Sequence, residues 1–219
     1  MAKAVVLKKG FFVAGHPRSG TSLVCQLAES GGVDFPSDFE GDEYNKEGYY
    51  ELAEAKELSK NLLAEAMTPE NTRKMNDIVR KLNDIDGWPG LKLVRIPAIF
   101  FYRHLAKKMK AIFVYRNPAN VKASLFKRGL GEFPISWLKN SNALIAAYEN
   151  IEDSIIVSYE SLLEQKQHVR AGFSRLGLEV DLQRVMPDRQ TQKDSRIYLT
   201  EDEKNMYSLL QKLEKESCQ

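Results

Sequence analysis

Short, unbroken hydrophobic runs alternate along the chain with longer segments in which hydrophobic residues recur every three or four positions. The clearest runs, at residues 11–14, 111–115 and 155–157, are typical of strands that are buried on both faces. Weaker strand candidates lie at 33–35 and 91–94. Because strands alternate with helices, we expect an α/β fold with three layers, in which a parallel sheet is flanked by helices.

Helical spacing predicts helices between these strands. The predicted helices run from about 21 to 30, over 51–67, from 69 to the glycines at 87–90, over 97–109, from 118 to about 128, over 136–148, over 161–176 and from 200 onward. Two of them have clear start signals. Thr68 is followed by Pro69 at the first helical position, and Thr200 with Glu203 has the spacing of a capping box.

The segment between the first buried strand and its helix has a phosphate-binding pattern, made of Gly15, His16, Pro17, Arg18, Ser19, Gly20, Thr21 and Ser22. Glycines let backbone N–H groups face a phosphate, and the helix adds the positive end of its dipole. The hydroxyls of Thr21 and Ser22 add donors. We therefore expect a fold of the P-loop nucleotide-binding type. The ATP-binding version has lysine after the second glycine, where this chain has Thr21, so ordinary Mg-ATP chemistry is disfavoured.

A second candidate anion site follows the strand at 111–115. Arg116 comes directly after this strand, and Ser124 lies about two turns along the helix that Pro118 opens. The planar fork of arginine suits phosphate oxygens. Ligands of parallel sheets bind outside the carboxyl ends of the strands, so Gly15 and Arg116 are expected on the same edge.

These segments resemble the donor site of sulfotransferases that use 3′-phosphoadenosine-5′-phosphosulfate (PAPS). The family's 5′-phosphosulfate loop reads Pro-Lys/Arg-Ser/Thr-Gly-Thr-Thr/Ser, as residues 17–22 do, and its 3′-phosphate site has arginine and serine spaced like Arg116 and Ser124. Residues 45–51 are similar to the Asn-x-x-Gly-Tyr-aromatic-Glu stretch of bacterial members, and residues 158–162 are similar to the Tyr-Glu-x-Leu segment after their last core strand. Many bacterial members carry Lys-Asp-Pro where this chain departs with Lys-Leu-Val at 92–94.

The resemblance implies a sulfotransferase that moves a sulfo group from PAPS to an acceptor hydroxyl or amine and releases 3′,5′-ADP (PAP), without a metal. The loop would hold the 5′-phosphate, and Arg116 with Ser124 would hold the 3′-phosphate. A basic C-terminal segment that includes Arg196 would fold over the nucleotide. Arg18 would stabilise the charge that grows on the leaving oxygen, a role for which a permanently charged guanidinium is suited.

The acceptor hydroxyl needs a base near the loop. In members of the family the base is a histidine or a glutamate. Glu51 is the preferred candidate because it falls in the stretch similar to the bacterial members, and Glu43 is the second. Glu40 is a further acidic candidate, and His16 is equally suited to serve as a base or to hold the loop in place.

Composition narrows the class of protein only slightly. The 32 Lys and Arg residues nearly balance 30 Asp and Glu, so nucleic acid and anionic membrane are not indicated as partners. The two cysteines do not indicate disulfides and favour the cytoplasm. We expect a single domain over residues 1–219, with a helical insertion at about 36–90 facing a small-molecule or carbohydrate acceptor. A divergent P-loop kinase or NTPase and a non-catalytic nucleotide-binding module remain as alternatives, and the oligomeric state is open.

Overall fold

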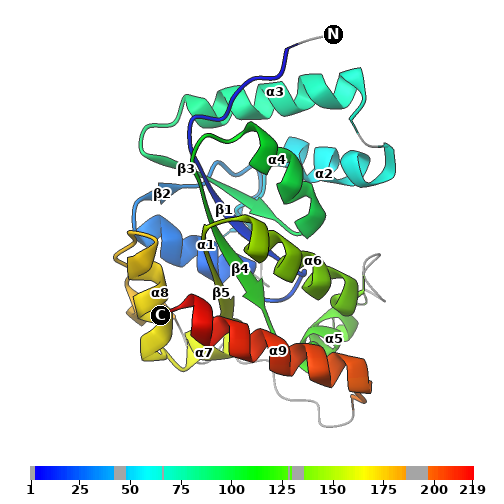
Figure 1. The fold of residues 1–219 in the computed structure, drawn as a ribbon, viewed down its shortest axis with the longest axis vertical. Helices are drawn as coiled ribbons and strands as arrows, with labels where there is room; N and C mark the ends of the chain where they lie inside the picture. The colour runs from blue at the N-terminus through cyan, green and yellow to red at the C-terminus, as the bar shows by residue number, and fades with distance from the viewer. Residues whose placement is uncertain (1–2, 42–47, 66, 128, 130–135, 186–196) are drawn as a thin grey trace.

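The computed structural model describes residues 3–41, 48–65, 67–127, 129, 136–185 and 197–219. Within them lies a parallel sheet, drawn as arrows in Figure 1, with the strand order β2-β3-β1-β4-β5. Its strands are β1 (Gly10–Gly15), β2 (Val33–Asp34), β3 (Trp88–Leu93), β4 (Met109–Tyr115) and β5 (Asp153–Ser158). The first strand of the chain therefore lies at the centre of the sheet.

Helices connect these strands and cover the sheet. They are α1 (Thr21–Ser30), α2 (Ala53–Glu65), α3 (Pro69–Asn83), η1 (Ile96–Ala98), α4 (Ile99–Leu105), α5 (Pro118–Lys127), α6 (Trp137–Asn150), α7 (Tyr159–Leu163), α8 (Gln167–Arg175), η2 (Leu182–Arg184) and α9 (Glu201–Ser217). The predicted start signals are confirmed in detail. The Thr68 side chain accepts a hydrogen bond from the N–H of Asn71, and Thr200 and Glu203 form a complete capping box.

Successive residues of the central strands face two different hydrophobic cores. In β1, Phe12 and Ala14 belong to a core shared with side chains of α2 to α6 and α9, whereas Phe11 and Val13 belong to a core shared with α1, α7 and α8. Every residue of β1 is buried, which explains why the run lacks polar positions. Helices on both faces of a parallel sheet confirm the predicted three-layer α/β fold (Figure 1).

The predicted helix over 97–109 is too long. Helix α4 ends at Leu105, because Ala106 has an extended backbone (φ −83°, ψ 130°) and pairs with Leu7 in a parallel bridge. The next residue, Lys107, donates its N–H to the carbonyl oxygen of Leu7. Pairing with the segment before β1 therefore replaces further helical turns, and Met109 already belongs to β4.

Two further boundaries differ from the prediction. The segment 161–176 forms two helices instead of one, because Gln165 adopts a left-handed φ of 49° between α7 and α8. Strand β3 begins at Trp88, before the predicted start at 91, although it includes Pro89. Pro89 is aligned with Asp34 of the two-residue edge strand β2, where a missing N–H costs little.

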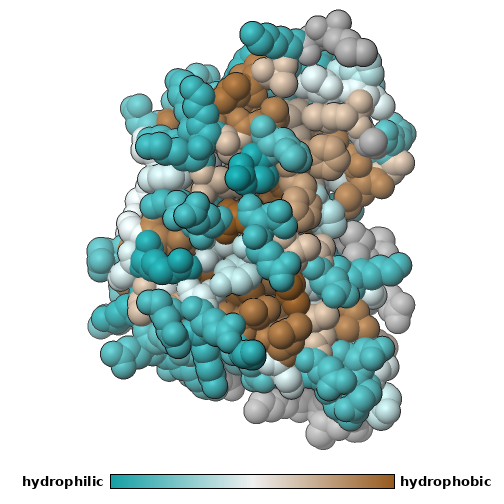
Figure 2. Space-filling view, viewed as in Figure 1, coloured by the Kyte–Doolittle hydropathy of each residue, from teal (hydrophilic) through white to brown (hydrophobic). Residues whose placement is uncertain are grey.

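The helices of the described part of the chain do not include a membrane span. None of the helices there combines the length and the hydrophobicity that a membrane span needs. On the face shown in Figure 2, hydrophobic side chains form patches between hydrophilic ones.

Candidate functional site

The phosphate-binding loop lies at the carboxyl edge of the sheet, between the end of β1 and the start of α1. Its two glycines are required by close approach. A Cβ atom on Gly15 would overlap the carbonyl oxygen of Val114 in β4. Gly20 has a φ of 92°, and a Cβ atom there would overlap the ring of Tyr159. No side chain caps α1, and its first turn contains no acidic residue. The positive end of this helix can therefore accept an anion.

Arg116 lies against this loop from the end of the neighbouring strand β4. Its Nη1 donates to the carbonyl oxygen of Arg18 at 3.2 Å, and its Cζ lies 4.3 Å from the centroid of the Tyr159 ring. Burial lowers the pKa of Arg116 from its ordinary value, since only 5% of the residue is exposed. The predicted second anion site is thus adjacent to the loop.

Ser124 completes this group from helix α5. The Nε of Arg18 donates a hydrogen bond to the Oγ of Ser124 at 3.1 Å, across 106 positions of sequence. Ser124 is buried, as is Arg116. The structure therefore brings both predicted anion-binding segments into direct contact, with the Arg18 side chain directed toward Ser124.

Lys92 contacts the loop from β3, on the other side of β1. It was not among the predicted site residues. Its Nζ donates to the Oγ of Ser22 at 3.0 Å and to the carbonyl oxygen of Tyr49 at 2.7 Å, and it lies 3.2 Å from Oε1 of Glu51. Its side chain is 3% exposed. The signal in the sequence is a lysine between Leu91 and Leu93, near the carboxyl end of a buried strand. The chain therefore departs from Lys-Asp-Pro at residues 93 and 94 only, and the lysine at position 92 contacts the loop.

Glu51 is held beside the loop by two cations. Its Oε1 faces Lys92, and its Oε2 lies 3.0 Å from the Nζ of Lys56. Burial opposes ionisation of this carboxyl group, but Lys92 and Lys56 together outweigh that effect and hold the pKa of Glu51 below its ordinary value. Glu51 is therefore ionised at neutral pH, as a proton acceptor must be.

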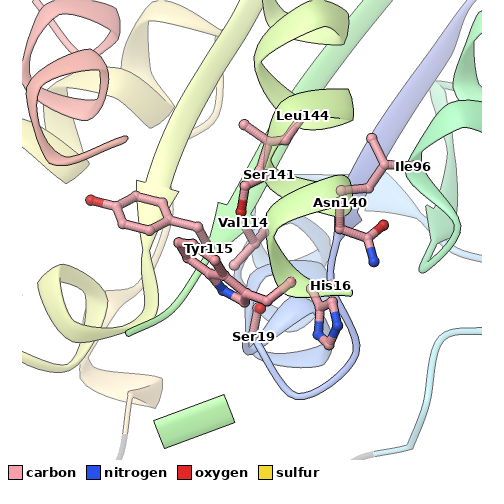
Figure 3. Close-up of a pocket in the computed structure, with 9 residues that line it drawn as sticks. His16, Ser19, Ile96, Val114, Tyr115, Asn140, Ser141 and Leu144 are labelled. Carbon is pink, nitrogen blue, oxygen red and sulfur yellow. The ribbon is translucent and has the colours of Figure 1, made fainter. Parts of the chain in front are cut away.

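Within the loop, His16 and Ser19 line a hollow too narrow for a water molecule. Figure 3 shows them facing Asn140 and Ser141 of helix α6. The Nδ1 of His16 lies 2.7 Å from the carbonyl oxygen of Pro17, and the N–H of Ser19 donates to the carbonyl oxygen of His16. The Ser19 hydroxyl has no hydrogen-bond partner among the described residues. This placement favours the structural role for His16 over the role of a base.

The other predicted site residues lie at the loop, at the surface or outside the described residues. Thr21 is buried at the start of α1, Pro17 lies in the loop, and Glu40 is exposed. Glu43 and Arg196 lie outside the described residues. In the rest of the chain, no group of three or more His, Cys, Asp or Glu side chains is arranged as a metal site.

A parallel α/β sheet with a glycine loop between its central strand and the next helix is a P-loop type of fold. The sulfotransferase domain of the olefin synthase from Synechococcus PCC 7002 has a similar structure, with a TM-score of 0.62 and 16% identity over 96% of this chain and 97% of that domain. Mouse sulfotransferase SULT7A1, solved with PAP, aligns with a TM-score of 0.47 and 12% identity over 90% of this chain and 70% of that one. No protein-family model matches the sequence, and no curated protein matches it. The chain thus shares the fold of a sulfotransferase domain.

Proposed function

We propose that this protein is a sulfotransferase that uses PAPS and transfers its sulfo group to a hydroxyl or amine of a small-molecule or carbohydrate acceptor. The observation that carries the proposal is the contact between two anion-binding segments at one edge of the sheet. Arg116 bonds to the backbone of Arg18, and Arg18 bonds to Ser124. The fold shared with a sulfotransferase domain supports this function.

The residues at this edge fit a nucleotide that carries phosphate on both sides of its ribose. Gly15 and Gly20 let the loop pack closely against β4 and the Tyr159 ring, and the first N–H groups of α1 have no side-chain cap. The loop would hold the 5′-phosphate, and Arg116 with Ser124 would hold the 3′-phosphate. When bound, PAPS supplies the sulfo group that is transferred.

Arg18 has two possible partners in this scheme. Its Nε now donates to Ser124, on the side proposed for the 3′-phosphate. To stabilise the charge that develops on the leaving oxygen of the 5′-phosphate, its guanidinium would release Ser124 and turn toward that phosphate. A cation that gains its partner only as charge develops lowers the barrier more than it stabilises the ground state.

Glu51 is the proposed base for the acceptor, with Glu43 kept as the second candidate. Lys92 connects Glu51 to the loop, because its Nζ contacts both Glu51 and the Ser22 hydroxyl. An acceptor hydroxyl that donates to Glu51 would thereby lie beside the 5′ side of the donor. Helices α2 and α3, which lie within the predicted insertion at about 36–90, are proposed to form part of the acceptor side.

The alternative of a P-loop kinase or NTPase is disfavoured by the partner of Ser22. In ATP-binding loops the hydroxyl at this position holds a magnesium ion. Here the Lys92 ammonium lies 3.0 Å from the Ser22 Oγ, and a divalent cation at the same hydroxyl would be repelled. A non-catalytic nucleotide-binding module is distinguished from a sulfotransferase by the transfer assay below.

Binding of 3′,5′-ADP and of ADP by isothermal titration tests the proposal. We expect the wild-type protein to prefer 3′,5′-ADP, and Arg116→Ala to weaken that binding by about 1.5–3 kcal/mol, the range for a hydrogen bond to a charged group. Arg170→Ala, which removes an exposed arginine on α8, is the matched control and should bind normally.

Incubation with PAPS and an acceptor library, followed by mass spectrometry, tests the transfer itself. Sulfated product is expected with the wild-type protein. Tighter binding of ADP, or a requirement for magnesium, would contradict the proposed function. Selective 3′,5′-ADP binding without product from any acceptor would instead favour the non-catalytic module.

A further inference from the structure

The carboxylate of Glu214, on the last helix α9, is buried beneath the ends of β4 and β5. The hydroxyl of Tyr115 donates to its Oε2 at 2.5 Å, and the backbone N–H of Ser158 donates to its Oε1 at 3.2 Å. The Ser158 hydroxyl lies 3.3 Å from the same Oε1, and the Nε2 of His168 lies 3.2 Å from it. Only 4% of the Glu214 side chain is exposed. One carboxylate thus connects the last residues of two neighbouring strands.

Each of these strand ends leads directly into the proposed donor site. Tyr115 is followed by Arg116, and Ser158 is followed by Tyr159. The Ser158 oxygen also accepts a hydrogen bond from the N–H of Ser161 at 3.0 Å and so caps helix α7, which begins at Tyr159. The position of the Tyr159 ring therefore depends on a serine that Glu214 binds.

The Tyr159 ring contacts both halves of the donor site. One side of the ring lies so close to Gly20 that a Cβ atom at that position would overlap it. The guanidinium of Arg116 lies over the ring, with its Cζ 4.3 Å from the centroid. A shift of this ring would displace the loop glycine and the arginine together.

We propose that Glu214 is a positioning residue for the donor site, which sets the placement of Arg116 and Tyr159 through Tyr115 and Ser158. This inference rests on the proposed function, in which Arg116 and the loop bind the donor. Burial and the Glu214 carboxylate raise the pKa of Tyr115, so its hydroxyl stays protonated and remains a donor. Because Ser158 N–H can only donate, no neutral apolar side chain can replace the acceptor that Glu214 supplies.

Glu214→Met tests the proposal, because it keeps the side-chain length and removes both acceptor oxygens. We expect the Kd for 3′,5′-ADP to rise about tenfold, which corresponds to about 1.4 kcal/mol. The preference for 3′,5′-ADP over 5′-AMP should also fall, because Glu214 affects the position of Arg116 through the ends of both β4 and β5. Glu214→Gln should restore most of the binding, since its amide oxygen can accept from Ser158 and its NH₂ group can donate to the Tyr115 oxygen.

Ser217→Ala is the matched control on the same helix. Ser217 also binds β5, but it bonds to the backbone of Ile156 in the middle of the strand. This variant should lose stability and keep both the Kd and the preference between nucleotides. All titrations are made at a temperature at which each variant is folded by circular dichroism.

The possible outcomes are distinct. An unchanged Kd and preference in Glu214→Met, or an equal loss in Ser217→Ala, would overturn the positioning role and leave the proposed function standing. If wild-type protein does not bind 3′,5′-ADP, the proposed function fails and this inference fails with it. If Glu214→Met does not fold, Tyr115→Phe decides, because it removes the hydroxyl that joins Glu214 to the end of β4 and so to Arg116; unchanged Kd and selectivity in that variant overturn the proposal.

Discussion

The Lys92 ammonium is shared by three oxygen acceptors, which are the Ser22 hydroxyl, the Tyr49 carbonyl group and the Glu51 carboxylate. An ammonium has three N–H donors, so each acceptor takes one. Because the side chain is almost fully buried, its charge acts on Glu51 with little screening from solvent. Lys56, the other partner of Glu51, has a side chain that is 49% exposed and is screened more strongly.

Replacement of Lys92 by methionine should therefore raise the pKa of Glu51. In the wild-type protein the pKa of Glu51 is lowered from its ordinary value of 4.5, so this carboxyl stays ionised to a pH below that value. The stability gained from ionisation is lost only as the pH falls through the lowered pKa. In Lys92→Met, the acid limb of the transfer rate and the Glu51 carboxyl titration followed by NMR should both move to higher pH. Lys56→Met should cause a smaller shift in the same direction. Equal shifts in the two variants would contradict the dominant role of Lys92.

Most of the proposed donor site could be predicted from the sequence, because its residues lie next to the ends of recognisable strands. Gly15 and Arg116 follow unbroken hydrophobic runs, and the parallel topology places both at one edge. The role of Lys92 could not be predicted in the same way. Its partners Tyr49 and Glu51 come from the segment between β2 and α2, whose sequence has no periodic pattern of hydrophobic residues.

At the scale of elements, helix ends marked by specific side-chain hydrogen bonds were predicted well, and helix ends set by tertiary contacts were not. The starts of α3 and α9 follow from Thr68 and Thr200, whose side chains accept backbone N–H groups. The end of α4 depends on the bridge between Leu7 and Ala106, which are far apart in sequence. No local pattern encodes a pairing of that kind.

The capping box of α9 leads to a prediction for that element. Thr200→Ala removes the acceptor for the N–H of Glu203, which lies at 3.2 Å, and should lower the free energy of unfolding by about 1 kcal/mol. For a chain of this size, that loss corresponds to a fall in Tm of about 2–4 °C. Thr68→Ala removes the corresponding acceptor on α3 and should cause a similar fall. A Tm for Thr200→Ala equal to that of the wild-type protein would show that the cap does not stabilise α9.

At the scale of the whole molecule, the carboxyl edge of the sheet receives contributions from segments spread along most of the chain. The loop follows β1, Lys92 comes from β3, and Arg116 follows β4. Helix α9, near the end of the chain, supports the ends of β4 and β5 through Glu214. The proposed site therefore depends on the packing of the first and last elements on one sheet, and its integrity should follow global unfolding.

The reactivity of the two cysteines can report whether the first and last elements unfold together. Cys25 in α1 and Cys218 at the end of α9 are both buried, and burial raises the pKa of Cys25 to about 12 and that of Cys218 to about 11. Because the thiolate is the reactive form, both should resist iodoacetamide in the native protein. Both thiols belong to the same hydrophobic core, so mass spectrometry across a urea series should show them reacting at the same midpoint. Labelling of Cys218 at urea concentrations that leave Cys25 protected would show that α9 detaches alone, and Cys218→Ser identifies which thiol carries each label.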